Sequence, residues 1–387
     1  MSIVRHRTVR NWTVRALPAA LAAVLAVGVP TADAADIPKS TQEFLKQLNF
    51  GEDKLAGLDK ELAVPQAWLD DARKNPTVRV GGSEDPPLHA QMIKPFLERY
   101  PFIKVQFQRG SANERVIRPL LAFREGRYLM DVVRSMDGSL SEFIAANAAT
   151  DMRDLPTFNV ALEGSHAEGG IAISFRQRPY CMAYNPDLVR EDQMPKTWKD
   201  LPNTPILANG RIGVVMLPHL WFMPLWGKFG EEWATQYLDD FFVKLQPQVR
   251  REGLNAAMSL VGAGENYVSI PAYGERIKQL RDKGSPVKWY CPQDIVPVER
   301  PNLTIFRGTP NMAAAKLYVN WVLSKEGQIA QLAVFEALPI HKDLQSDDFW
   351  LYPDQMRGRE LINFNDQPAT EKFLKMWNKY ALGSSGK

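Results

Sequence analysis

The sequence predicts an α/β protein with two lobes, each a mixed, mainly parallel sheet flanked by helices. Short apolar strands alternate with helical segments along most of the 387 residues, a pattern typical of sheets covered on both faces. The chain is long enough for two domains of ordinary size. An extended stretch at residues 171–184 and a return near Ile295 predict two crossings between the lobes, hence a two-strand hinge.

The first 34 residues have the pattern of an export signal. Four arginines precede an apolar run of 14 residues that begins at Ala16, and Ala32-Asp33-Ala34 offers a cleavage site. The run is too short to span a bilayer. We therefore expect export to the periplasm, and no lipid anchor, because no cysteine lies near the cleavage site.

The charge of the chain argues against nucleic-acid binding. The net charge is +3, and the predicted signal, with four arginines and one aspartate, accounts for all of it. The remaining residues therefore have no excess of basic side chains to bind a phosphate backbone.

The elements follow in order after the signal. Residues 35–75 carry apolar side chains at spacings of three and four, which predicts an N-terminal extension of short helices. Strands at 78–80, 103–107 and 130–133 are each followed by a turn and a helix. We assign residues 76–178 and 293–387 to lobe one. Residues 179–292, with strands at 211–216 and 267–272, form lobe two.

Two blocks in the second half of the chain carry a family resemblance. One, at residues 284–328, contains PQDIVPV, GTPN and SKEGQ, with Thr309 suited to a helix N-cap and Pro310 to the first helical position. The other is YNPDLV followed by MPKTWKDL, from Tyr184 to Leu201. In this order they resemble the periplasmic solute-binding proteins of ABC importers, in particular the ferric-iron and related type II binders.

The resemblance implies a type II periplasmic-binding-protein fold and a transport role without enzymatic activity. Its partners would be a small solute and an inner-membrane ABC permease, and we expect a monomer that needs no cofactor. No G-x-S-x-G, HExxH, P-loop or G-x-G-x-x-G pattern is present. A secreted hydrolase is the alternative from another class. Ser165, His166 and Glu168 bring a serine, a histidine and a carboxylate together in the sequence, but triad members this close cannot converge through their own short backbone.

The resemblance also bears on iron. In ferric members the strand after a Gly-Glu turn ends in two adjacent tyrosines that bind the metal. Here Tyr273 matches the first tyrosine and Gly274 replaces the second. Iron(III) needs several anionic oxygen ligands, so the loss disfavours it. We expect a small polar organic solute; iron(III), held by Tyr273, Tyr267 and Asp137 as transported ligand, is the alternative.

The candidate contact set lies at strand ends and in the turns after them, where ligands bind in such sheets. It comprises Ser83, Asp85, Ser111 and Asp137 from lobe one and Tyr273 from lobe two. The alternative for the serines and aspartates is helix capping. Trp221 is added because the segment at 216–222 is bulky and apolar, which suits stacking on a carbon skeleton; core packing is its alternative.

The two cysteines, Cys181 and Cys291, leave two interpretations open. In an oxidising compartment they could form a disulfide. They could equally be two buried thiols on core strands.

Overall fold

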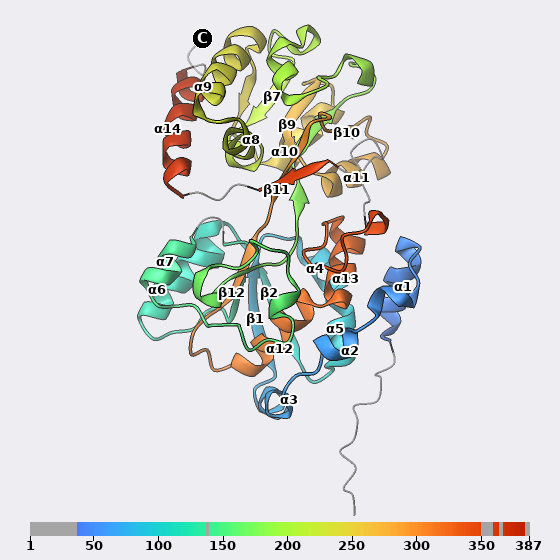
Figure 1. Ribbon diagram of the computed structural model, residues 1–387, viewed down its shortest axis with the longest axis vertical. Coiled ribbons are helices and arrows are strands. Elements are labelled where there is room, and N and C mark those ends of the chain that lie inside the picture. Colours follow the sequence, from blue (N-terminus) through green and yellow to red (C-terminus); the bar gives the residue numbers. More distant parts are fainter. Residues whose placement is uncertain (1–36, 137–138, 350–358, 364–366, 384–387) are drawn as a thin grey trace, which may run out of the picture. The chain divides into compact units, whose positions relative to one another are not determined.

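The computed structural model describes residues 37–136, 139–349, 359–363 and 367–383 (Figure 1). These residues form two five-stranded sheets and one three-stranded sheet, all flanked by helices. The predicted export signal lies outside them. Among the helices described, none has the length and apolar character that crossing a membrane requires.

The first sheet, the centre of lobe one, joins strands from both halves of the chain. Its inner strands are built from β-branched residues that are fully buried, among them Val78, Val80 and Val132. The first three strands in the sheet order run parallel, and the last two join antiparallel. The order is β2 (Lys104–Arg109), β1 (Thr77–Gly82), β3 (Val132–Arg134), β12 (Asn302–Ile305) and β4 (Ile173–Ser174).

Helices cover this sheet, and the N-terminal extension packs with them. Phe44 and Leu58 of the extension share one buried cluster with Trp321 and Leu332. The Glu61 carboxylate of the extension also accepts a hydrogen bond from the buried His341 ring, with 2.9 Å between Oε1 and Nε2. The helices are α1 (Lys39–Leu48), α2 (Leu58–Glu61), α3 (Gln66–Lys74), α4 (Pro86–Met92), α5 (Lys94–Arg99), α6 (Arg118–Arg124), α7 (Leu140–Ala145), α12 (Met312–Leu323) and α13 (Lys325–Phe335).

The start of α12 differs from the sequence prediction. The helix begins at Met312 with Asn311 at the N-cap, two residues later than expected. Thr309 lies before the N-cap; its hydroxyl donates to the buried Asp131 carboxylate and accepts from the Asn311 amide at 3.4 Å. A distant partner has thus been added to the local contact that the sequence suggested.

The second sheet is the centre of lobe two. Three strands run antiparallel at one side and three parallel at the other, sharing β9. In both lobes, parallel and antiparallel pairs among the described strands are equal in number, so the sheets are mixed as predicted but not mainly parallel. The order is β10 (Lys288–Tyr290), β6 (Cys181–Tyr184), β9 (Val268–Ala272), β7 (Ile212–Val215) and β8 (Gln248–Arg250), with α8 (Phe222–Phe229), α9 (Glu231–Asp240), α10 (Leu254–Gly262) and α11 (Gly274–Asp282) around it.

The hinge has three strands, where the sequence predicted two. β11 (Ile295–Glu299) pairs antiparallel with β5 (Arg178–Pro179) and parallel with β13 (Glu360–Ile362). The chain thus reaches lobe two a third time, and α14 (Gln367–Gly383) lies beside α9 (Figure 1).

The assignment of residues 293–387 to lobe one is therefore wrong for the last helix. Phe373 and Trp377 of α14 belong to the lobe-two core, where their rings lie 5.5 Å and 6.3 Å from that of Phe222. Their spacing of four residues places both rings on one helix face, and burying that face accounts for the docking.

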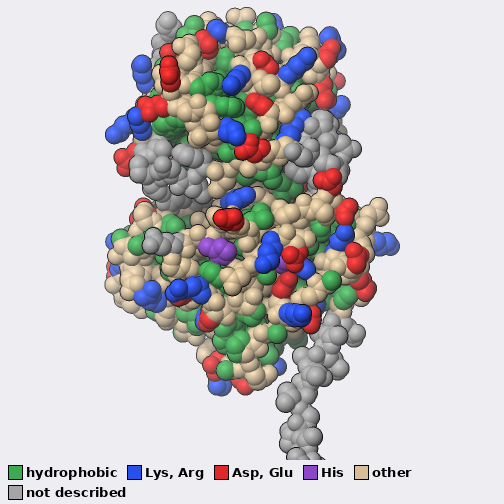
Figure 2. Space-filling view, in the orientation of Figure 1, with side chains coloured by type: hydrophobic (Ala, Val, Ile, Leu, Met, Phe, Trp, Pro, Cys, Tyr) green, Lys and Arg blue, Asp and Glu red, His purple; other side chains and the backbone are tan. Residues whose placement is uncertain are grey.

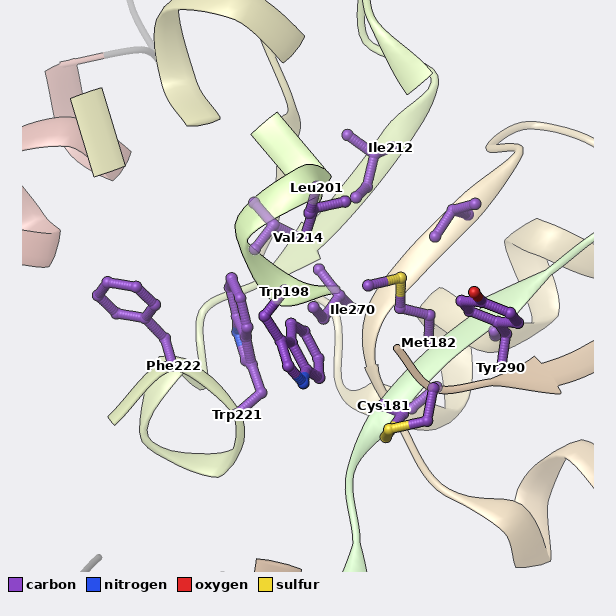
Figure 3. Packing of buried hydrophobic residues seen from close by; sticks show 14 of the residues in the cluster. Cys181, Met182, Trp198, Leu201, Ile212, Val214, Trp221, Phe222, Ile270 and Tyr290 are labelled. Atoms are coloured by element: carbon purple, nitrogen blue, oxygen red, sulfur yellow. A yellow bond between two sulfur atoms is a disulfide. The ribbon is translucent and has the colours of Figure 1, made fainter. Parts of the chain in front are cut away.

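Cys181 and Cys291 form a disulfide, with Cα atoms 5.0 Å apart. Cys181 opens β6 and Cys291 follows the adjacent strand β10, where Tyr290 pairs with Met182. Strand pairing thus brings together two thiols separated by 110 residues, and Figure 3 shows Cys181 beside the lobe-two core.

Candidate functional site

Two lobe-one turns meet at the carboxyl ends of neighbouring strands, as predicted. Ser83 follows β1 and Ser135 follows β3, and their hydroxyl oxygens lie 3.4 Å apart. Arg115 joins the turn after β3 to the turn after β2 by donating from Nε to the carbonyl of Ser135 and from Nη1 to that of Gly110. Asp137, also predicted here, lies outside the described residues.

Asp85 and Ser111 already have partners within lobe one. Asp85 pairs with Arg109, which ends β2, and both side chains are partly exposed. The amide and hydroxyl of Ser111 both donate to Glu114 Oε2, at 2.8 and 2.9 Å. Ser111 is therefore held by a local side-chain contact, and a ligand would have to compete with Glu114.

Between these turns lies a buried carboxylate that the contact set omitted. Glu84 Oε1 is 3.0 Å from Arg134 Nη2 and 3.3 Å from Arg176 Nη2, and all three side chains are at most 1% exposed. Burial by itself would raise the pKa of Glu84, but the two guanidinium groups outweigh it and hold that pKa well below its usual range.

Arg134 is further anchored inside lobe one. Its Nη1 donates to the Tyr318 hydroxyl at 2.8 Å and its Nη2 to Gln331 at 3.3 Å. The same hydroxyl lies 2.9 Å from His89 Nε2. Burial and the charge of Arg134 lower the pKa of His89 to about 3, so the buried ring is neutral near pH 7.

The first hinge crossing supplies two arginines with side chains on one face. Arg176 and Arg178 are two residues apart in an extended segment, which directs both the same way. Gln177 between them points away and donates to the Pro339 carbonyl. Burial, and then the charge of Arg178, lower the pKa of Arg176 to about 10, so both arginines are charged at neutral pH.

Lobe two contributes Tyr273 and Glu275 at the start of α11. The Arg178 guanidinium carbon lies 5.1 Å from the Tyr273 ring centroid, and Arg178 Nη2 lies 3.8 Å from Glu275 Oε2. The Tyr273 hydroxyl donates to Asn255 of α10. Burial raises the pKa of both Tyr273 and Glu275, although Arg178 opposes the rise.

Comparison with known protein families identifies the family to which the chain belongs. Residues 91–356, more than half of the chain, match the family model described as bacterial extracellular solute-binding protein. The chain belongs to this family. This match confirms the resemblance to solute-binding proteins that the two sequence blocks carried.

Solved structures show that the fold is shared as well. Iron-bound HitA from Pseudomonas aeruginosa is 18% identical with a TM-score of 0.62, and the alignment covers 78% of this chain and 98% of that one. AfuA from Actinobacillus pleuropneumoniae, with fructose-6-phosphate bound, is 16% identical with a TM-score of 0.61, covering 79% and 98%.

Curated relatives match over shorter stretches. An uncharacterised protein of Haemophilus influenzae is 27% identical over 35% of this chain and 39% of its own length. A probable ABC transporter periplasmic-binding protein of Sinorhizobium fredii is 23% identical over 44% of this chain and 49% of its own length. The chain thus spans less than half the length of these relatives.

The two tyrosines suggested for iron do not converge in this solute-binding protein, and Asp137 lies outside the described residues. Tyr267 precedes β9 and Tyr273 follows it, so the six steps between them span about 20 Å of extended chain. Tyr267 is instead covered by Arg211, whose guanidinium carbon is 5.1 Å from its ring centroid. Among the described residues, no group of three or more His, Cys, Asp or Glu side chains could hold a metal ion.

Trp221 lies in the core of lobe two, with no exposed surface. Its ring stacks on Trp198 at 5.7 Å and touches Phe222 at 5.4 Å (Figure 3). A ring without an exposed face has none to offer a solute in this conformation. We therefore leave Trp221 out of the contact set that follows.

Sequence reasoning missed Glu84, Arg176, Arg178 and Glu275. One signal could have found the arginines: they alternate with other residues in the FRQRPY stretch of an otherwise apolar hinge segment. Charged side chains are almost never fully buried unless paired. Two arginines on one face of a buried crossing therefore predict acidic partners or a ligand.

A separate pocket of about 320 Å³ lies elsewhere on lobe two and shares no residue with this cluster. Its lining is Glu191, Asp192, Met194, Lys196, Tyr290, Gln293 and Arg359.

Proposed function

We propose that this protein captures a small polar solute in the periplasm and delivers it to an inner-membrane ABC permease. Family membership supports solute binding, and the name of the Sinorhizobium fredii relative supports the transporter. The predicted export signal supports the location. We further propose that the protein acts as a monomer.

One observation carries the proposal: polar groups from lobe one, the hinge and lobe two lie within a few side chains of one another. Glu84 of lobe one contacts Arg176 of the hinge, and Arg178 of the hinge contacts Tyr273 and Glu275 of lobe two. A solute held here would touch both lobes. Its differential affinity for the closed arrangement would drive closure, and energy for transport would come from the permease.

The proposed contact set keeps Ser83, Asp85, Ser111, Asp137 and Tyr273. The contact of Ser83 with Ser135 and the position of Tyr273 at the start of α11 support their inclusion. Arg176 and Arg178 are added to it.

Iron(III) is the second candidate ligand, favoured by the likeness to iron-bound HitA. Tyr273 would be its single tyrosine ligand at this end of β9, since Gly274 follows it. We consider an organic solute the better match for a site with two arginines.

The experiment is to isolate the protein from the periplasm of its native host and identify by mass spectrometry what co-purifies. We expect one stoichiometric small organic solute whose addition to stripped protein raises the melting temperature and compacts the protein in X-ray scattering. A visible tyrosinate–iron charge-transfer band would establish iron instead. Absence of any stabilising solute across a broad library would contradict the proposed function.

A further inference from the structure

Buried ionic groups are crowded between the lobes. Arg134, Arg176 and Arg178 are 0%, 1% and 16% exposed, and they face the carboxylates of Glu84 and Glu275, at 0% and 14%. A third carboxylate, Glu299, lies opposite Arg178 in the pairing of β5 with β11. Burial penalises a charged group whose hydrogen bonds are not all made, so donors left over in this cluster favour an anionic partner.

Hydrogen-bond donors are unsatisfied at the same place. Arg176 Nε and Nη1 and Arg178 Nε are buried and have no hydrogen-bond partner among the described residues. Arg134 also has an unpartnered Nε, but both of its terminal nitrogens donate to lobe-one acceptors. Buried donors in native proteins nearly always have a partner, so the unpartnered face of the two hinge arginines indicates where one binds.

The geometry of the hinge suits a group with several oxygens. Residues two apart in extended chain have Cα atoms about 6.5–7 Å apart and side chains on the same face. Each guanidinium is a planar fork that matches the oxygens of a carboxylate or phosphate. The neighbouring Arg178 contacts with Tyr273 and Glu275 place lobe two at the same position.

We propose that the solute carries an oxyanion, a carboxylate or a phosphate, and that Arg176 and Arg178 bind it at the hinge. This inference rests on the proposed function and names its substrate class. Cationic solutes such as polyamines are excluded by it, because an ammonium group has no acceptor to offer the unpartnered guanidinium donors. An oxyanion bound to the hinge strand itself would couple occupancy to the angle between the lobes.

The test uses one variant with a closely matched control. Arg178→Gln removes the guanidinium that covers Tyr273 after β9. Arg211→Gln removes the guanidinium that covers Tyr267 before the same strand, with the same 5.1 Å distance between guanidinium carbon and ring centroid. Arg176→Lys keeps the charge and removes the fork, which tests bidentate binding without leaving Glu84 unpaired.

Binding is measured by titration calorimetry and melting temperature on the full mature chain. The probes are fructose 6-phosphate and glycerol 3-phosphate for phosphates, citrate and succinate for carboxylates, fructose as a neutral solute and putrescine as a cation. We expect at least one oxyanion to bind. Comparing the two phosphates with the two carboxylates shows which kind of oxyanion the site prefers. Arg178→Gln should weaken that binding about tenfold or more, and Arg211→Gln by less than about twofold.

Other results would overturn the inference. Binding of fructose or putrescine in place of every oxyanion would refute the oxyanion while leaving the proposed function standing. Unchanged oxyanion affinity in Arg178→Gln and Arg176→Lys would show that the arginines are structural. If no probe binds, the co-purifying solute decides, and a neutral or cationic one refutes the inference. Failure to find any solute would contradict the proposed function itself.

Discussion

Arg178 of the hinge lies over the ring of Tyr273 in lobe two, with its guanidinium carbon 5.1 Å from the ring centroid. Such cation–π contacts are worth about 0.5–2 kcal/mol and strengthen when water is excluded. The Tyr273 hydroxyl is held from the other side by Asn255. The residue that matches the family's tyrosine position is thus oriented by the hinge.

Tyr273→Phe should weaken solute binding roughly tenfold, because one polar contact to a solute is worth about 1–3 kcal/mol. The ring and its contact with Arg178 are kept, and the loss of the hydrogen bond to Asn255 should lower the free energy of unfolding by about 1–3 kcal/mol at most. Tyr267→Phe, at the other end of β9, is the control. Equal affinity of wild type and Tyr273→Phe for the identified solute would remove Tyr273 from the contact set.

Glu84→Gln should destabilise the protein by about 3–5 kcal/mol, because it leaves Arg134 and Arg176 buried without their counter-ion. Urea unfolding of the unliganded protein measures the effect. The exposed pair of Asp192 with Arg190 provides the comparison, and Asp192→Asn should cost less than about 1 kcal/mol. A similar small loss in both variants would mean that the buried network contributes little.

Acid should destabilise the protein partly through His89. Its pKa is about 3 in the folded protein and 6.5 in the reference state, so the unfolded chain binds more protons between these values. Stability from this residue is present above pH 6.5 and is lost as the pH falls towards 3. His89→Gln should flatten stability against pH across this window, by at most about 1.4 kcal/mol per pH unit. Parallel wild-type and variant curves there would contradict the assignment.

Loss of the disulfide should destabilise lobe two. Cys181 and Cys291 enclose 110 residues of sequence, and opening a loop of that length costs about 2–5 kcal/mol. Reductant should lower the melting temperature of the wild type. It should have no effect on the Cys181→Ser/Cys291→Ser double variant, and an equal effect on both proteins would indicate that the bond does not form in solution.

The docking of α14 can be tested on a single helix. Trp377 is fully buried against Phe222 and Trp221, and Leu374 on the same helix is 39% exposed. Trp377→Ala should cost about 3–5 kcal/mol through cavity formation. Leu374→Ala should cost far less, and equal effects would argue that α14 does not dock on lobe two.

Local patterns predicted most strands within a residue or two of the observed bounds, because alternating burial is recorded in neighbouring positions. The mature surface agrees with the charge argument: the face in Figure 2 shows acidic and basic side chains interspersed. Predictions failed where a distant partner decided the outcome. Thr309 donates to Asp131 while Asn311 takes the N-cap position of α12, and Trp221 packs against Trp198.

By itself, the sequence determined the alternation of strands and helices, the family and the turns at which candidate residues lie. Only the tertiary structure decided the third hinge strand, the pairing of the cysteines and the unpartnered donors of Arg176 and Arg178. The physical reason is range. Helix and strand formation depends on residues a few positions apart, whereas an ion pair, a disulfide or a docked helix depends on which distant segments share a low-dielectric interior.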